Sequence, residues 1–294
     1  MKTLLGIVLA SALIASPASA AVRAPASSTP AMEQTLPGTA PITSYVNLKD
    51  IVAGYGHLLQ NPAIVKLLEQ LNAVLPDPEH LVAEVGIAGQ LHRGVQVDTT
   101  FVVRGKISQA ELLAKLAEHG VVLTESAYRG VPLHTGPFKL GLSVQVGLVD
   151  EACTLVSFDP SADHPVNKRT IDTLRGTIPS FGDVTTWAPV PHALFSSVMK
   201  TEAIADLLAQ HGIPSGLVKH IELASMAVVP KVFPPKLQVQ YALHCDTEEN
   251  AKRVKTLVKR LHFVLVVLPG FLHGDFHHPF KIVQEGRRVY LVTS

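Results

Sequence analysis

Two stretches of alternating side chains constrain the fold of this chain more than any other feature of its sequence. Residues 95–104 alternate apolar with polar side chains, and residues 237–244 repeat that pattern in the second half. A period of two predicts β-strands that bury one face and expose the other, as in antiparallel sheets. The polar faces include Asp98 in the first stretch and His244 in the second. We therefore expect both of these side chains to be exposed.

The alternating strands occupy the same place in a recurring order of elements. In the first half, the pattern predicts strands at residues 42–46, 81–91, 95–104, 131–135, 142–149 and 152–158. It predicts helices at residues 48–59, from Pro62 to the stop at Pro76, and at residues 108–119 and 166–174. In the second half it predicts strands at residues 192–198, 221–229, 236–244, 281–284 and 288–293, and helices at residues 201–211 and from residue 247. Antiparallel strands with helices between them are typical of α+β proteins. The sequence thus predicts two diverged tandem repeats, each a mainly antiparallel sheet with helices packed on one face.

Capping residues indicate where several helices begin and end. Ser108 followed by Glu111 has the spacing of a capping box, and His119 before Gly120 is typical of a helix C-terminus. Asp163 is the expected cap of the helix at residues 166–174. Asp163 and His164 also form an acid-base pair, but the sequence identifies no nucleophile to accompany them.

The N-terminus has the features of a secretory signal peptide: Lys2, an apolar stretch at residues 4–14, and a small-residue site ending at Ala20. Residues 1–20 are therefore predicted as a signal peptide. Residues 21–40, rich in Ala, Pro, Ser and Thr, are predicted as a disordered leader. The first repeat is placed at residues 41–176, a connector at 177–190 and the second repeat at 191–294. We expect an exported protein, either periplasmic or secreted.

The charge balance argues against one broad class of partner. The chain has 25 Lys and Arg against 24 Asp and Glu, a formal net charge of +1. Nearly neutral chains are not typical of nucleic-acid binders. The sequence also contains no GxSxG, Walker, GxGxxG, CxxC or HExxH motif. It therefore predicts no cofactor and no catalytic residue, and it favours a non-enzymatic binding or interaction module.

Three of the 14 histidines gather in one segment near the C-terminus. His273, His277 and His278, together with Asp275, have a composition that can bind zinc. An intervening glycine and a following proline argue against the helix that would place His273 and His277 on one face. The segment is either a solvated loop or the metal site of a metal-binding protein or metal-dependent hydrolase.

The helix that begins near Thr247 carries basic side chains outside its apolar stripe: Lys252, Arg253, Lys255, Lys259 and Arg260. Acidic residues at the start of this helix complement its dipole, so the basic set is a solvated face in one interpretation. In the other, it contacts anionic lipid headgroups or an acidic polymer.

Two further residue pairs leave alternatives open. Trp187 in the connector either fills the joint between the halves or, together with Phe263, lines a pocket for a small apolar ligand. Phe263 otherwise belongs to a buried last helical turn or a central strand. Cys153 and Cys245 could form one disulfide in an exported chain, or they could stay as thiols.

Two motifs of the first half are similar to a pattern in a group of bacterial proteins. Arg104-Gly105-Lys106-Ile107-Ser108 precedes a predicted helix, and Tyr128-Arg129-Gly130-Val131 precedes a predicted strand. In these motifs the chain resembles uncharacterised exported α+β proteins of unknown function. The resemblance implies no activity and no catalytic residue. An envelope polymer, a lipid surface and a protein partner all fit such a chain.

Overall fold

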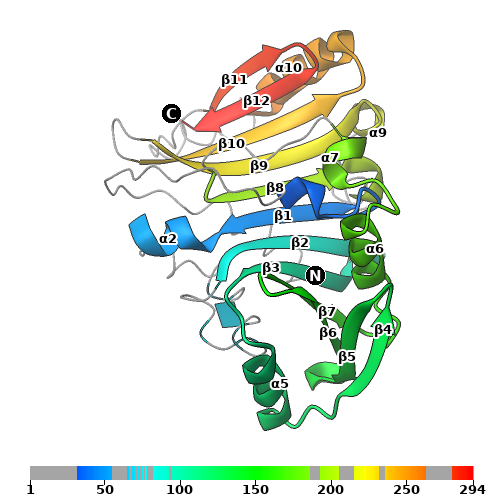
Figure 1. Cartoon of the computed structure of the whole chain (residues 1–294). Coiled ribbons are helices and arrows are strands. Elements are labelled where there is room, and N and C mark those ends of the chain that lie inside the picture. The colour runs from blue at the N-terminus through cyan, green and yellow to red at the C-terminus, as the bar shows by residue number, and fades with distance from the viewer. Residues whose placement is uncertain are drawn as a thin grey trace. The chain divides into compact units, whose positions relative to one another are not determined.

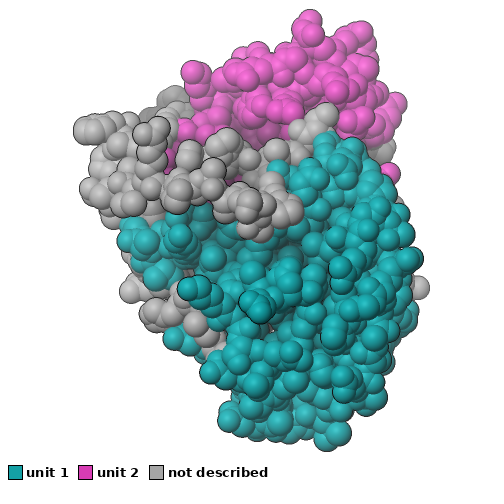
Figure 2. Space-filling model, viewed as in Figure 1, with its two compact units in different colours: residues 1–189 teal, residues 190–294 magenta. Residues whose placement is uncertain are grey.

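The chain divides into two compact units, residues 1–189 and 190–294 (Figure 2). The computed structural model describes residues 32–54, 82–92, 95–185, 193–204, 215–231, 236–262 and 280–293, and residues 65, 68, 69, 72, 75 and 77 singly. The predicted signal peptide lies outside these residues. Each unit combines antiparallel strands with helices, so the predicted α+β class is confirmed.

The first unit is built on one antiparallel sheet (Figure 1). Its strands lie in the order β1 (Ile42–Asn47), β2 (Val82–His92), β3 (Val95–Gly105), β7 (Cys153–Asp159), β6 (Ser143–Asp150), β5 (Val131–Pro137) and β4 (Thr124–Tyr128). β2 and β3 form a long hairpin, with Gly86 opposite Val102. β4 was not predicted from the sequence. It pairs with β5 and ends this part of the sheet, where most of its side chains are exposed.

Three helices of the first unit follow their predicted positions where they are described: α2 (Leu48–Gly54), α5 (Gln109–Glu118) and α6 (Pro165–Leu174). A 3-10 turn, η4, at Lys139–Gly141 was not predicted. The helix predicted from Pro62 lies mostly outside the described residues. The Ser108 side chain accepts a hydrogen bond from the Glu111 backbone N–H and so caps α5. His119 is the C-cap of α5, and Gly120 follows with φ of 76°, so both predicted ends are confirmed.

Both faces of β3 are buried, which corrects the expectation of one exposed face. Asp98 and Thr100, placed on the polar face, are 2% and 0% exposed. Phe101 and Val103, on the opposite face, are also buried. α6 packs against β2, β3 and β7 and covers the face that carries Asp98. Alternation alone therefore identified the strand but not its environment.

The segment before β1 is ordered and packed, although the sequence placed it in the disordered leader. Met32–Gln34 forms a 3-10 turn, η2, and Leu36 is fully buried. The predicted connector likewise contains a short helix, α7 (Phe181–Val184), with a capping box between Ser180 and Asp183. The backbone N–H of Phe181 donates to the Leu36 carbonyl at 2.7 Å, so the two segments hold each other in place.

The second unit has a smaller antiparallel sheet. Its strands lie in the order β8 (Phe195–Lys200), β9 (Ile221–Lys231), β10 (Lys236–Cys245), β12 (Arg288–Thr293) and β11 (Phe280–Glu285). Short turns lie at η5 (Thr201–Ile204) and α9 (Ser215–Val218), and α10 (Glu248–His262) packs against β10, β11 and β12. Ala251 and Val254 of α10 form a core with Cys245 and Val289. Only the first turn of the helix predicted at residues 201–211 is described, and it is a 3-10 turn.

The strand order β8-β9-β10-β12-β11 has the same form as β1-β2-β3-β7-β6 in the first unit. This likeness of order does not confirm the tandem repeat, which stays a prediction. Within the described residues, no helix is long and apolar enough to cross a membrane.

His244 on β10 is buried, so the prediction of an exposed histidine is wrong. Its side chain is 6% exposed, and its Nε2 lies 3.1 Å from the Ser225 hydroxyl on the neighbouring strand. Burial, together with the nearby Arg288 charge, lowers the pKa of His244 to about 4. The ring is therefore neutral at physiological pH.

Candidate functional site

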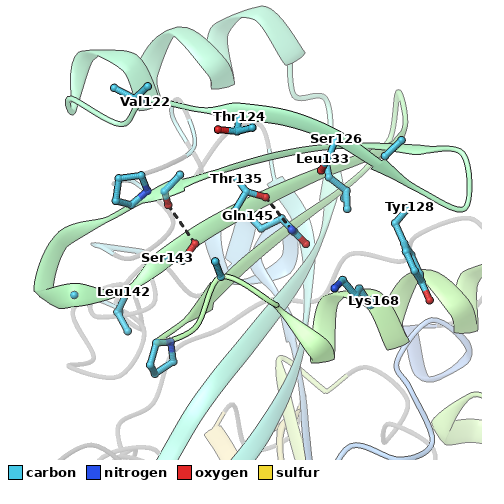
Figure 3. Close-up of a pocket in the computed structure, with 16 residues that line it drawn as sticks. Val122, Thr124, Ser126, Tyr128, Leu133, Thr135, Leu142, Ser143, Gln145 and Lys168 are labelled. Atoms are coloured by element: carbon cyan, nitrogen blue, oxygen red, sulfur yellow. Dashed lines mark hydrogen bonds between the residues drawn. The ribbon is translucent and has the colours of Figure 1, made fainter.

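A groove of about 810 Å³ lies on the first unit, over β4, β5 and β6 (Figure 3). The start of α6 and the turn at residues 160–162 close its other side. Polar groups contribute much of the lining: Thr124, Ser126, Tyr128, Thr135, Ser143, Gln145 and Lys168. Aliphatic side chains such as Leu133 and Leu142 fill the spaces between them. A concave site with several convergent polar groups is the usual form of a ligand-binding site.

The strand register fixes two of these polar groups. Thr135 on β5 lies opposite Gln145 on β6, so both side chains point to the same side of the sheet. The Gln145 amide donates to the Thr135 hydroxyl, the bond drawn as a dashed line in Figure 3, over a distance of 2.9 Å. The Gln145 carbonyl oxygen accepts from Asn167 of α6 at 2.7 Å. The Gln145 side chain is therefore held between sheet and helix at the floor of the groove.

Behind the groove, a buried chain of hydrogen-bonding groups runs from Ser143 to Asp98. Nε2 of His164 lies 3.0 Å from the Ser143 hydroxyl, and Nδ1 lies 3.0 Å from the Ser157 hydroxyl. The Ser157 hydroxyl lies 3.4 Å from the Asp98 carboxylate. Three strands and the start of α6 thus meet at one histidine that is fully buried.

Asp98, not Asp163, accepts the hydrogen bond from a free backbone N–H at the start of α6. The Asp98 carboxylate accepts from the Val166 backbone N–H at 2.8 Å, whereas Asp163 pairs with Lys168 on the surface. His164 occupies the cap position and offers no capping hydrogen bond, so the predicted Asp163 cap is wrong. Burial raises the pKa of Asp98 to about 6, because desolvation outweighs the bond from Val166. Burial also lowers the pKa of His164, which keeps its ring neutral.

The backbone of His164 is strained. Its φ of 47° and ψ of 57° lie in the left-handed region, which costs energy for a side chain other than glycine. The two ring hydrogen bonds and the following Pro165, which is well suited to the first helical position, hold it there. The sequence signal was the Asp163-His164 pair, but nothing in the sequence joined it to Ser143 or Ser157.

Several predicted site residues lie outside the described residues. These are the candidate metal ligands His273, Asp275, His277 and His278, and the candidate pocket residues Trp187 and Phe263. Among the described residues, no group of three or more His, Cys, Asp or Glu side chains is placed to hold a metal ion. The metal site and the apolar pocket remain predictions.

The basic residues of α10 are described, and two of them are already paired. Lys252 lies 3.3 Å from Glu248, and Arg253 lies 2.5 Å from Glu249, each one helical turn earlier. Lys259 and Arg260 are exposed, and Lys255 is half-buried. The cationic surface of the helix is therefore concentrated toward its C-terminal half.

Cys153 and Cys245 are both free thiols in the structure. Burial raises the pKa of each to about 11, so neither is a reactive thiolate near neutral pH. The disulfide between them is not formed here, and their pairing stays a prediction.

Comparison with known proteins finds structures of similar fold but identifies no family. No family model and no curated protein matches the chain. Crystal form III of TP0453 has a TM-score of 0.51 and 12% identity, and covers 91% of this chain and 95% of its own. Crystal form I of TP0453 has a TM-score of 0.52 and 12% identity, and covers 91% and 93%. At this identity the likeness concerns the fold alone.

Proposed function

We propose that this chain is an exported cell-envelope protein whose first unit binds a segment of a neutral envelope polymer in the groove over β4, β5 and β6. The observation that carries the proposal is the lining of the groove, where hydroxyl and amide groups from three strands converge. Export is supported by the signal-like N-terminus, with its apolar stretch at residues 4–14 and its small-residue site at Ala20.

The chemistry of the lining favours a ligand rich in hydroxyl and amide groups. Thr124 and Ser126 are exposed, and Gln145 is held in place by its bonds to Thr135 and Asn167. Among the described residues that line the groove, Lys168 alone is charged, and Asp163 pairs with it. A ligand with a high charge therefore finds little compensation there. Oligomers of N-acetylated hexosamine, which carry hydroxyl and amide groups and no charge, fit this lining.

The test is a titration of the mature protein with a soluble N-acetylglucosamine oligomer, followed by calorimetry. Thr124→Arg places a bulky cation in the groove, and Thr177→Arg makes the same change at an exposed threonine outside it. We expect Thr124→Arg to weaken binding at least tenfold and Thr177→Arg to leave it unchanged. Absence of binding by the unsubstituted protein, or equal weakening by both variants, would refute the proposed ligand class.

A second candidate function is contact with an anionic surface through α10. The observation that favours it is the position of Lys255, Lys259 and Arg260 beyond the two ion pairs at the start of the helix. Vesicle flotation separates this function from the first. Binding to anionic vesicles should fall as salt rises and should be lost in Lys259→Glu plus Arg260→Glu, since exposed charges are screened by salt. Binding to neutral vesicles that is indifferent to salt would rule out this mode.

A further inference from the structure

The Ser143 hydroxyl is hydrogen-bonded to a neutral histidine at the wall of the groove. Ser143 opens β6 and lines the groove (Figure 3), and its residue is 9% exposed. Its oxygen lies 3.0 Å from Nε2 of His164, and the hydroxyl can instead donate to the Gly136 carbonyl oxygen at 3.3 Å. The direction of the bond to His164 decides whether the serine is activated, because a hydroxyl has only one proton to donate.

The other end of the hydrogen-bonded chain fixes that direction. While the Asp98 carboxylate is ionised it can only accept, so the Ser157 hydroxyl must donate to it. Ser157 then accepts from Nδ1–H of His164. A neutral imidazole carries one proton, so the Nε2 lone pair faces Ser143. At 3.0 Å it is a nearer acceptor for the Ser143 proton than the Gly136 carbonyl oxygen at 3.3 Å. This is the tautomer in which a histidine serves as general base for a serine.

Two further observations separate this arrangement from an ordinary buried network. His164 is held in a left-handed backbone conformation, and such strain is concentrated at functional sites. Ser143, at the end of the chain, borders a groove that a ligand can enter, whereas Ser157 is fully buried. The activated hydroxyl is thus the one group of the network that is placed to meet a substrate.

The geometry points to a catalytic site: Ser143 is a nucleophile that accepts acyl groups from carboxylic esters in the groove, with His164 as its general base. This activity goes beyond the proposed polymer binding and shares only the groove with it. Asp98 and Ser157 do not touch the substrate and act as positioning residues through His164.

The reaction balances with water as the only co-reactant. The Ser143 oxygen attacks the ester carbonyl carbon while its proton moves to Nε2 of His164. The bond from the carbonyl carbon to the alcohol oxygen then breaks, and the alcohol leaves with the proton from His164. Water, deprotonated by His164, cleaves the acyl-serine in the second half, which returns the serine and releases a carboxylic acid.

Protonation of Asp98 would reverse the direction of each hydrogen bond between Asp98 and Ser143. A neutral Asp98 can donate to Ser157, Ser157 to Nδ1, and Nε2–H to Ser143, whose own proton then points to the Gly136 carbonyl oxygen. Asp159 on β7 and Arg169 on α6 act on the Asp98 charge with opposite signs, and Asp163 and Lys168 act on His164. Reactivity should therefore rise with pH as Asp98 ionises.

The test uses the whole protein and a fluorophosphonate probe, which transfers its phosphonyl group to an activated serine with loss of fluoride. Mass spectrometry locates the label, and the labelling rate is measured from pH 5 to pH 8. We expect Ser143 to be labelled, with a rate that rises as Asp98 ionises. Ser143→Ala should abolish labelling at this site, and Thr177→Ala, which removes an exposed hydroxyl outside the groove, should leave the rate unchanged.

Two variants test the roles of the supporting residues. His164→Asn suits the left-handed backbone and should slow labelling about 100-fold or more, in the range of general base catalysis. Asp98→Asn should remove the rise of the rate with pH. Amide hydrogen exchange of each variant establishes that it is folded. No label at Ser143 in the folded protein, or labelling that is unaffected by His164→Asn, would overturn the proposal, while polymer binding is measured separately by calorimetry.

Discussion

At neutral pH, the buried carboxylate of Asp98 carries a charge that destabilises the folded first unit. Its folded-state pKa of about 6 lies above the ordinary value of 3.8, so the folded chain holds this proton more tightly than the unfolded chain. The group therefore favours folding below pH 3.8, and this contribution is lost as pH rises through about 6. After allowance for solvent screening the loss amounts to about 1–3 kcal/mol.

Asp98→Asn should remove that slope. An amide can still accept from Val166 N–H, and it carries no charge to desolvate. We will see this as a difference in the free energy of unfolding, measured by urea denaturation between pH 4 and pH 7. With rising pH it should decrease less in the variant than in the unsubstituted protein. The same slope in both proteins would show that Asp98 does not titrate in this range.

His244 has the opposite effect in the second unit. Its folded-state pKa of about 4 lies below the ordinary 6.5, so its stabilising contribution is present above pH 6.5 and is lost as pH falls toward 4. His244→Gln keeps a group that can reach the Ser225 hydroxyl and cannot be protonated. We expect this variant to lose less stability than the unsubstituted protein between pH 6.5 and pH 4, by roughly 1–3 kcal/mol. The same loss of stability in both proteins over this range would contradict the prediction.

These two residues show what alternation can and cannot predict. The period of two correctly identified β3 and β10, because pleating alone determines it. It placed Asp98 and His244 on exposed faces, because it assumes that one side of the sheet meets water. Asp98 instead lies beneath α6, and its burial depends on a helix more than 60 residues later in the sequence. Burial of a polar strand residue therefore requires knowledge of tertiary packing.

At the scale of elements, the segment that precedes β4 packs so closely against β5 that a glycine is needed there. Gly136 of β5 is buried, and a methyl group added there would lie 2.5 Å from the Val122 carbonyl oxygen, a backbone atom that cannot rotate away. Gly136→Ala should therefore displace the segment before β4 and cost about 1–3 kcal/mol, as overpacking commonly does. It should also weaken ligand binding, since Val122 and Thr124 line the groove.

Gly147→Ala on β6 is the matched control. The added methyl group would lie 3.1 Å from a terminal carbon of the Leu133 side chain, which can shift. We expect Gly147→Ala to change the melting temperature and the ligand affinity much less than Gly136→Ala. Equal effects of the two substitutions would mean that the backbone contact at Val122 does not position β4.

The elements that the sequence missed are short or exposed. The sequence of β4, Thr124–Tyr128, has no alternation because most of its side chains are exposed at the edge of the sheet. α7 has four residues, too few for a helical period. The groove depends on β4, so the candidate site could not be derived from patterns that required a buried face. The pairing of Ser143 with His164 depends further on the β6–β7 register and the position of α6.

At the scale of the whole molecule, the second unit has a core of its own. Val254 of α10 is 1% exposed and packs with Ala251, Cys245 and Val289, all within residues 190–294. Val254→Ala removes two buried methyl groups and leaves a cavity, which should cost roughly 1–3 kcal/mol. Because the lost contacts lie within the second unit, the substitution should favour the opening of strands in this unit more than in the first unit.

Amide hydrogen exchange followed by mass spectrometry measures this for each element. We expect peptides from β9, β10 and β12 to lose more protection in Val254→Ala than peptides from β2, β3 and β7, since local openings need not involve the whole chain. Lys252→Ala, at an exposed position of the same helix, should leave both sets nearly unchanged. An equal loss of protection in both sets would show that the chain opens as one cooperative unit, and ligand binding to the first unit would then protect the second as well.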